Sequence, residues 1–292
     1  YNTAVGAAAG QSVTTGVENT LVGGLAGDAL TSSADNTAVG YQALGSATTG
    51  NENTAVGHSA LFTNILSDRN VALGLDTLRN HDQASSIDSY NVAVGYNTGA
   101  AVTTGVQNTL IGALAGDALT DADYNVAIGY SSLSADTLGS KSTAIGVGAL
   151  ESQRPVDGSG NDVATDMYNT AVGYTAGLSV STGTINTLVG ALAGDAIDTG
   201  SENAALGYES AGALTVGVKN TALGAYALRV DKKGSQSVAV GHQALAAQNF
   251  TSATDVYNVA VGANAGVAVT TGVQNTLVGG FAGDALTTGG NN

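Results

Sequence analysis

The chain has 292 residues, a formal net charge of −15, and a composition with 42 Gly, 1 Pro, no Trp and no Cys. The negative charge argues against a nucleic-acid-binding protein, because Lys and Arg, of which only 8 occur, must neutralise the phosphates. The lack of Cys excludes a disulfide scaffold and a Cys-ligated zinc site. No apolar run approaches the length of a membrane-spanning helix, so we expect no membrane insertion in this segment.

From its first residues the chain repeats a five-residue phrase, Asn-Thr/Val-Ala/Leu-Val/Ile/Leu-Gly, with few departures. Sixteen copies occur at a 17-residue step, except for steps of 21, 27 and 21 after the fifth, ninth and fourteenth copies. A longer period is superposed, since the stretch at Tyr1 recurs at Tyr168 and that at Tyr90 recurs at Tyr257. The copies begin at Asn2, Asn19, Asn36, Asn53, Asn70, Asn91, Asn108, Asn125, Ser142, Asn169, Asn186, Asn203, Asn220, Ser237, Asn258 and Asn275.

Each copy is too short to fold alone and is typical of a short strand followed by a corner, then a return strand or an arc. Stacking the copies pairs each strand with its neighbours above and below, as in repeat proteins whose core exists only through adjacent units. We therefore predict an all-β fold, a parallel β-solenoid (β-roll) of about sixteen 17-residue coils over residues 1–292. Because the chain opens in mid-phrase, we expect it to be a continuous segment of a longer protein.

We number the places of each coil from the first residue of the phrase. Gly at the fifth place suits a corner with positive φ or a close backbone approach. Asn at the first place is expected to stack into a ladder of side-chain amides. The eighth place is always Ala, Ser or Thr, which indicates crowding between backbones.

Successive strand residues point to opposite faces, so the second and fourth places face one way and the third the other. We predict that the second and fourth places face the coil interior, with Val5, Val22, Val39 and Val56 as one interior column. The third place, Ala or Leu, would then face outward. An apolar outer face needs a partner, which predicts a second copy of the chain and loss of assembly when Ala38 and Ala55 are replaced by Asp.

The phrases "NTAVGYQAL" (residues 36–44) and "NTAVGHSAL" (residues 53–61), linked by "GSATTGNE", resemble the head repeats of trimeric autotransporter adhesins of the YadA type. They are also similar to repeats of related phage tail-fibre and bacterial surface proteins. The resemblance covers the whole chain and implies a left-handed β-roll in a side-by-side homotrimer. The 17-residue step is longer than the adhesin repeat, so handedness and trimer are implied by the resemblance alone.

Candidate ligand groups are scattered, and we expect no catalytic, metal or cofactor site. His58, His81 and His242 lie in different coils and are interpreted as surface residues. The segment "DGSGND" (residues 157–162) lacks the Glu and the correctly placed Gly of an EF-hand, which favours a polar turn. One column of carboxylates is either an exposed acidic row or a weak cation site; it holds Asp28, Asp117, Asp195 and Asp284.

Tyr occurs mainly in two columns, just before the first place and just after the Gly, where it can stack sugars or cover coil edges. The Gly-rich stretch "GGLAGD" (residues 23–28) lacks the Lys and Ser/Thr of a P-loop and is interpreted as structure. Asn249-Phe250-Thr251 matches a glycosylation acceptor.

Three coils are longer than the rest, at residues 70–90, 142–168 and 237–257. Their extra residues follow Leu78, Leu150 and Leu245, and an insertion is free to vary and to leave the stack. We predict that specific binding lies there, or else that the insertions are passive bulges. The residues that distinguish these coils are Arg79, His81, Arg154, Pro155, Asp157, Asp162 and Phe250.

Repetition and the lack of clustered catalytic groups predict a structural and adhesive extracellular fibre segment, not an enzyme. Its expected partners are copies of itself and a cell-surface or glycan receptor. The alternative is a phage tail-fibre shaft that binds host-surface glycans. A polysaccharide-degrading β-helix would need Arg or Lys beside a base. An ice-binding solenoid needs Thr rows facing water, whereas the second-place Thr column is predicted to be interior.

Overall fold

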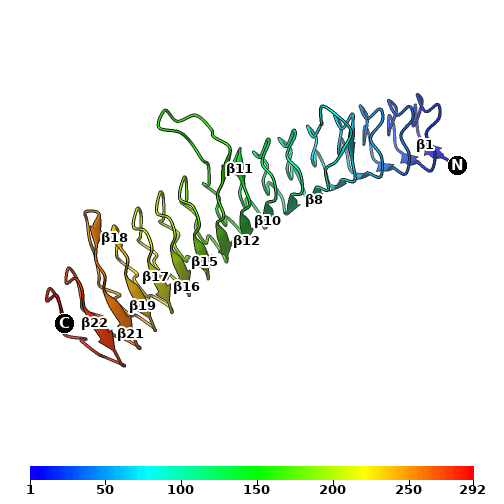
Figure 1. Ribbon diagram of the computed structural model, residues 1–292. Helices are drawn as coiled ribbons and strands as arrows, with labels where there is room; N and C mark the ends of the chain where they lie inside the picture. The colour runs from blue at the N-terminus through cyan, green and yellow to red at the C-terminus, as the bar shows by residue number, and fades with distance from the viewer. The chain divides into compact units, whose positions relative to one another are not determined.

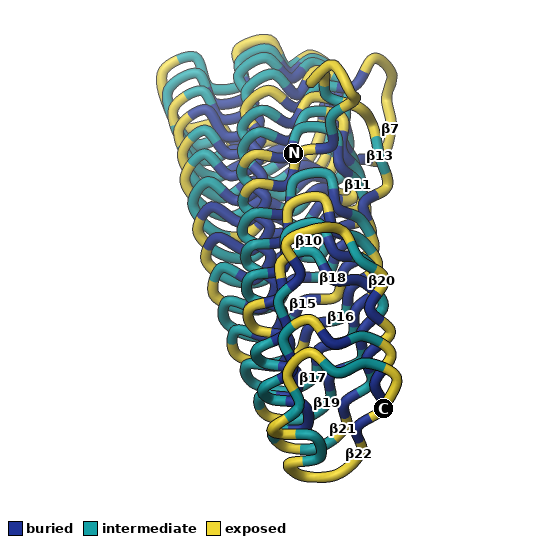
Figure 2. The backbone as a smooth tube through the Cα atoms, turned by 90° about the vertical axis from the view of Figure 1, so that its left-hand side faces the viewer, coloured by how far each residue is buried: buried dark blue, intermediate teal, exposed yellow.

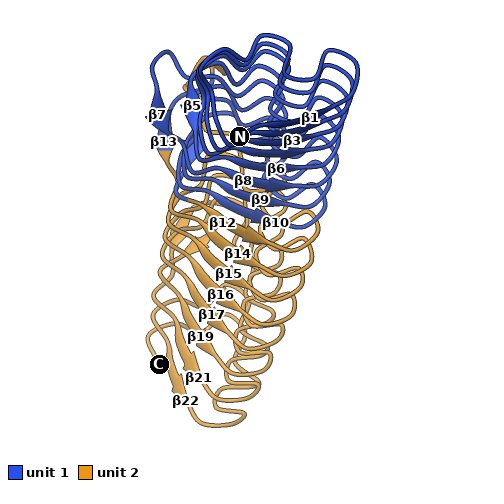
Figure 3. Ribbon diagram, turned by 90° about the vertical axis from the view of Figure 1, so that its right-hand side faces the viewer, with its two compact units in different colours: residues 1–141, 162–165 blue, residues 142–161, 166–292 orange.

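The computed structural model describes residues 1–292 and contains no helix. It is a parallel β-solenoid of about sixteen turns, as the repeat predicts. The chain divides into two compact units, residues 1–141 with 162–165 and residues 142–161 with 166–292 (Figure 3). With no helix present, none has the length and hydropathy to cross a membrane.

In the first unit, eight three-residue strands stack in parallel and in chain order (Figure 1). Residues 17 apart pair, as Thr37 does with Thr54, and residues 21 apart pair across the longer coil, as Val71 does with Val92. The strands are β1 (Thr3–Val5), β2 (Thr20–Val22), β3 (Thr37–Val39), β4 (Thr54–Val56), β6 (Val71–Leu73), β8 (Val92–Val94), β9 (Thr109–Ile111) and β10 (Val126–Ile128).

The second unit repeats this arrangement with eight strands. The register is kept across a 27-residue coil, where Thr143 pairs with Thr170, and across a 21-residue coil, where Val238 pairs with Val259. The strands are β12 (Thr143–Ile145), β14 (Thr170–Val172), β15 (Thr187–Val189), β16 (Ala204–Leu206), β17 (Thr221–Leu223), β19 (Val238–Val240), β21 (Val259–Val261) and β22 (Thr276–Val278).

The remainder of each regular coil is an arc of turns without a return strand. Six two-residue strands occur only in the longer coils and in the coils just before them. They are β5 (Ser67–Asp68), β7 (Ile87–Asp88), β11 (Gly139–Ser140), β13 (Thr165–Asp166), β18 (Gly234–Ser235) and β20 (Thr254–Asp255). β5 pairs with β7 and β18 with β20, so these pairs attach a longer coil to its predecessor.

The strands face the other way from our prediction. The third-place Ala or Leu is buried in every strand except β1, whereas the second and fourth places are half-buried or exposed. Val5, Val22, Val39 and Val56 do stack in one column, but on the outer face. The same order of buried and exposed segments recurs from coil to coil in Figure 2. Ala38 and Ala55 are therefore interior residues, and replacing them with Asp would affect folding before assembly.

The fifth-place Gly combines both expected properties. Gly40 has φ +136°, and a Cβ on it would lie 2.5 Å from the carbonyl oxygen of Gly57 in the next coil. A side chain here would meet backbone, which cannot yield, so the repeat tolerates only Gly at this corner.

The core is one aliphatic side chain deep, and the ninth place decides which side chain fills it. Where the third place is Leu, as at Leu21, the ninth is Gly27, and a Cβ there would lie 2.8 Å from Leu21 Cδ2. Where the third place is Ala38, the ninth is a fully buried Leu44. Other coils are small at both places, as at Ala93 and Gly99, and there a Cβ on Gly99 would lie 2.7 Å from Leu110 Cδ1 and 3.0 Å from Leu78 Cδ2 of the neighbouring coils, so Leu side chains of adjacent coils fill the space.

The predicted ladder of side-chain amides is present and buried. Asn36 Oδ1 accepts the N–H of Asn53 at 2.9 Å, and Asn36 Nδ2 donates to Asn19 Oδ1 at 3.1 Å and to the carbonyl of Gly50 at 2.9 Å. Each Asn therefore joins the strand of its own coil to the next strand and to the far side of the coil. Eighth-place residues are buried in all but the first and last coils, among them Ala43 and Ala60, and Ser132 and Thr98 donate to fifth-place Gly carbonyls.

Candidate functional site

Each of the three longer coils holds a polar side chain inside the solenoid, at the twelfth place. These side chains belong to His81, Gln153 and Gln248, and all are fully buried. The coil just before each also carries a buried polar residue at the same place, namely Asn64, Asp136 and Asp231. In the other coils this place is Ala, Val, Leu or Ile. An insertion is thus accompanied by a pair of buried polar residues.

In the coil 237–257 the buried amide replaces a rung of the ladder. Ser237 stands where other coils have Asn, and Gln248 Nε2 donates to its hydroxyl at 3.0 Å. Gln248 Oε1 accepts from Asn258 Nδ2 at 2.9 Å, as an Asn side chain would. Gln248 also donates to Asp231 Oδ2 at 2.5 Å, and Asp231 Oδ1 accepts the N–H of Phe250 at 3.0 Å. The insertion is therefore fixed to the interior by hydrogen bonds.

His81 is buried, so its interpretation as a surface residue is wrong. Its Nε2 lies 3.5 Å from Asn91 Nδ2, and its Nδ1 has no partner. Burial lowers the pKa of His81 to about 4, because the charged imidazole would lose its hydration. His58 and His242 are exposed, as expected.

The residues that distinguish the longer coils divide into exposed and buried groups. Arg79, Arg154 and Asp157 are exposed, Asp162 is half-buried, and Pro155 and Phe250 are buried. Phe250 therefore cannot contact a receptor without unfolding its coil. Asn249, beside it, is half-buried, and its Oδ1 atom is buried.

The segment 157–162 is a polar turn, as expected. Asp157 Oδ1 accepts the N–H groups of Ser159 at 2.8 Å and Asn161 at 2.9 Å. These bonds to the ionised form, those from Asn161 first, lower the pKa of the Asp157 carboxyl. The 151–161 stretch extends beyond the turns of the coils that follow it in its own unit (Figure 1).

The Asp column is less exposed than an acidic surface row would be. Asp28, Asp117 and Asp195 are half-buried, and only Asp284, in the last coil, is exposed. Burial raises the pKa of Asp117 and of Asp195. No group of three or more potential metal ligands occurs in the structure.

The two Tyr columns lie on the surface. Every member is at least 43% exposed, namely Tyr1, Tyr90, Tyr124, Tyr168 and Tyr257 before the first place, and Tyr41, Tyr96, Tyr130, Tyr174 and Tyr208 after the Gly. Most are separated by one or more coils. Contacts between rings on successive coils occur at Tyr41–His58, with centroids 5.4 Å apart, and along Tyr208–Tyr226–His242, at 5.4 and 5.9 Å.

The first longer coil carries a charged surface cluster. Arg69 donates to both carboxylate oxygens of Glu52, at 2.9 and 3.1 Å, and pairs with Asp88. Tyr90 hydroxyl donates to Asp88 Oδ2 at 3.0 Å. The hydrogen bond from Arg69 lowers the pKa of Glu52. These charges satisfy one another on three successive coils beside the insertion.

The outer face of the strands is the most uniform surface of the molecule. Its second and fourth places carry only Thr, Val, Ala, Leu and Ile in all sixteen strands. Fourth-place residues exposed by 37% or more are Val5, Ile111, Leu206, Val261 and Val278. Each unit thus presents an uncharged, largely apolar sheet face to its surroundings.

The chain matches no protein-family model and no curated protein.

Sequence reasoning missed two features of these surfaces. The orientation of the strands could have been inferred from the sequence, because third-place Leu occurs together with ninth-place Gly. A ninth place without a side chain leaves interior space for the Leu, which must therefore point inward. The second feature is a group of charged and aromatic side chains at the sixth, seventh and tenth places of the second unit. Asp195 and Tyr208 belong to columns that the repeat marks, but Glu209, Tyr226 and Arg229 do not, so the group was not recognised.

Proposed function

We propose that this chain is a structural and adhesive extracellular fibre segment that spaces or presents binding surfaces for attachment. The observation that carries the proposal is that some places of each coil maintain the fold while others differ from coil to coil. The first, third, fifth, eighth, ninth and twelfth places are committed to the ladder, the core and the corner, while the sixth, seventh and tenth places vary on a fixed backbone. Such a scaffold can repeat a weak contact many times, which turns it into firm attachment.

Attachment by the isolated protein tests this function. Beads coated with the full chain should bind to bacterial, animal-cell or mineral surfaces more strongly than beads coated with an acidic protein of similar charge. The same preparations should neither shorten acidic polysaccharides nor release reducing ends. Beads that bind no better than the control on any surface, or cleavage of a polysaccharide, would refute the proposal.

We further propose that the outer sheet face joins three copies of the chain. The apolar third place, from which we first expected a partner, lies inside the coil, so it no longer supports one. The uncharged outer face takes its place, because a chain with net charge −15 meets least repulsion where no charged residue occurs. A second copy offers an equally uncharged face along its whole length. The resemblance to YadA-type head repeats supports three copies.

Ice binding is a second candidate, because the second-place column faces outward and not inward as predicted. Thr3, Thr20, Thr37 and Thr54 form an uninterrupted outward row on successive strands. Val71 and Val92 then interrupt it. Measuring thermal hysteresis and the native mass of the same preparation distinguishes ice binding from assembly, since one face cannot both bind ice and join copies of the chain.

A further inference from the structure

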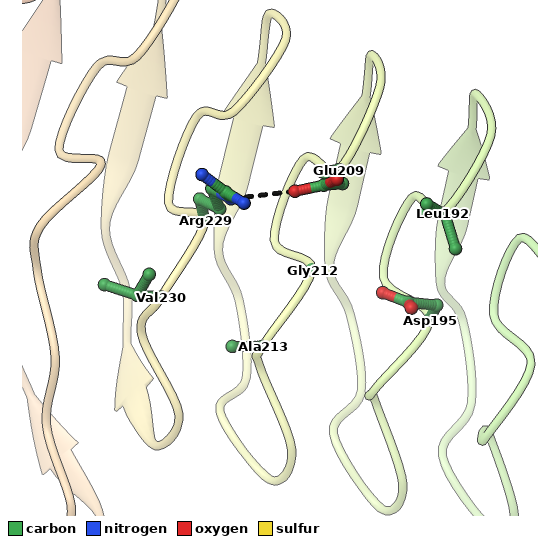
Figure 4. A pocket seen from close by; sticks show the side chains of 7 residues that line it. All are labelled: Leu192, Asp195, Glu209, Gly212, Ala213, Arg229 and Val230. Carbon is green, nitrogen blue, oxygen red and sulfur yellow. Dashed lines mark ion pairs between the residues drawn. The ribbon is translucent and has the colours of Figure 1, made fainter.

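The second unit contains a hollow of about 470 Å³ on the turns that follow β15, β16 and β17 (Figure 4). Leu192 and Glu209 supply the seventh place of successive coils, and Asp195, Gly212 and Arg229 the tenth. The hollow exists because Gly212 leaves the tenth place between Asp195 and Arg229 without a side chain. A second hollow of about 360 Å³ adjoins it and shares Arg229 and Val230.

The polar groups of this surface are held in place by one another. Arg229 Nε lies 2.7 Å from Glu209 Oε2, and the guanidinium carbon lies 4.9 Å from the centre of the Tyr226 ring. Tyr226 packs edge to face against Tyr208 on the preceding coil and His242 on the next. Hydrogen bonding with Glu209 raises the pKa of Tyr208. One guanidinium, two carboxylates and an aromatic ridge thus surround an open cavity.

We propose that these two adjoining hollows bind neutral carbohydrate, as two neighbouring sugar units of a surface glycan. Together they have the size of known small-ligand sites. Asp195 and Glu209 can accept hydroxyl hydrogen bonds, and Arg229 can donate them, which are the strong charge-assisted kind. Tyr226 lines the second hollow and offers aromatic surface to the C–H groups of a sugar ring.

Charge selects the class of sugar. The first hollow is lined by two carboxylates and one guanidinium, on a chain of net charge −15, so a uronic or sialic acid would be repelled. The same charge attracts an ammonium group, but that group would have to displace Arg229 from Glu209. A neutral sugar meets neither difficulty, and its hydroxyls match the mixture of donors and acceptors.

This site rests on the proposed adhesive function and adds its ligand class. It lies mostly on regular coils, whereas we expected binding on the insertions; the coil 237–257 contributes Gln243, Ala246 and Ala247 to the second hollow, the last two from directly after Leu245.

Saturation-transfer NMR and calorimetry on the full chain test the site with three disaccharides: one neutral, one containing a uronic acid and one containing an amino sugar. We expect the neutral disaccharide to bind with a Kd of about 1 mM, roughly tenfold tighter than the other two. Gly212→Leu should weaken it at least tenfold by filling the hollow, because a Cβ at Gly212 would lie 3.5 Å from Asp195 Oδ1. Leu178 occupies the equivalent place two coils earlier, so the side chain suits the fold.

Arg229→Gln should also weaken binding about tenfold, the effect of losing a charged hydrogen bond. Arg79→Gln is the matched control, since Arg79 occupies the same tenth place in the first unit and pairs with Asp76 at 3.6 Å. No binding of the neutral disaccharide at about 10 mM, a preference for either charged one, or unchanged binding in both folded variants would overturn the proposal. Bead attachment that persists in Gly212→Leu would place adhesion elsewhere and leave the proposed function standing.

Discussion

At the scale of single residues, the buried ladder accounts for Asn at the first place of every coil except those that begin at Ser142 and Ser237. Each Asn uses both of its side-chain atoms for groups that water cannot reach. A buried donor or acceptor left without a partner costs about 1–3 kcal/mol, so the ladder is held by the penalty for breaking it.

Asn108→Ala tests this. Asn108 Oδ1 accepts the N–H of Asn125 at 3.0 Å and Nδ2 donates to the carbonyl of Ala122 at 2.8 Å. Leaving these two groups unpaired should lower the free energy of unfolding by about 2–4 kcal/mol, measured in urea. Gln107→Asn, an exposed change one residue away, should alter it by less than about 0.5 kcal/mol. Equal effects of the two substitutions would show that the ladder contributes nothing.

His81 makes stability depend on pH. Its pKa is lowered in the folded chain to about 4 from 6.5, so above pH 6.5 both states are neutral and stability is unaffected. As pH falls below 6.5 the unfolded chain takes up a proton that the folded chain refuses, and stability is lost. The loss should reach about 2 kcal/mol by pH 5.

His81→Gln provides the comparison, because Gln occupies this place in the other two longer coils. Unfolding free energies of the wild type and the variant, measured from pH 7.5 to pH 5, should diverge as the pH falls. Parallel curves over that range would mean that His81 can be protonated within the fold.

At the scale of the coil, the insertions depend on residues inside the solenoid. The sequence was sufficient to predict the parallel stack, the register, the ladder and the Gly corner, since each is a column at a fixed period. It was insufficient for the orientation of the strands, because Thr-Ala-Val places small or apolar side chains on both faces. Gln248 and His81 were not recognised as interior residues, because their contacts lie 10 residues away, with Asn258 and Asn91. Only Gln248 replaces a rung, since Asn70 keeps the rung in the coil 70–90.

Gln248→Val should destabilise the coil 237–257 by about 2–4 kcal/mol, because Ser237, Asn258 and Asp231 would each lose a buried hydrogen bond. Adding Ser237→Asn should recover part of the loss. In the coil 70–90 the first place is Asn, and its side chain still reaches the next coil despite the insertion, since Asn70 Oδ1 accepts the N–H of Asn91 at 3.1 Å. Thermal unfolding of the two single variants and the double variant measures the coupling, and strictly additive effects would contradict it.

At the scale of the whole molecule, the two faces of the strand should respond differently to the same charge. Ala38→Asp buries a carboxylate inside the coil and should unfold it, seen as loss of the β signal in circular dichroism. Val39→Asp combined with Val56→Asp places charge on the outer face, where the chain should stay folded but lose its partners. A trimer that survives the outer pair of substitutions would show that its interface lies on another face.

The native mass of the wild-type chain, measured by sedimentation equilibrium at micromolar concentration, tests the central proposal most directly. Three copies joined by their outer sheet faces predict a mass three times the chain mass of 28.4 kDa. The Val39→Asp, Val56→Asp variant should give 28.4 kDa with an unchanged circular dichroism spectrum. A wild-type chain that sediments at 28.4 kDa, with its uncharged sheet face open to water, would contradict the proposed assembly.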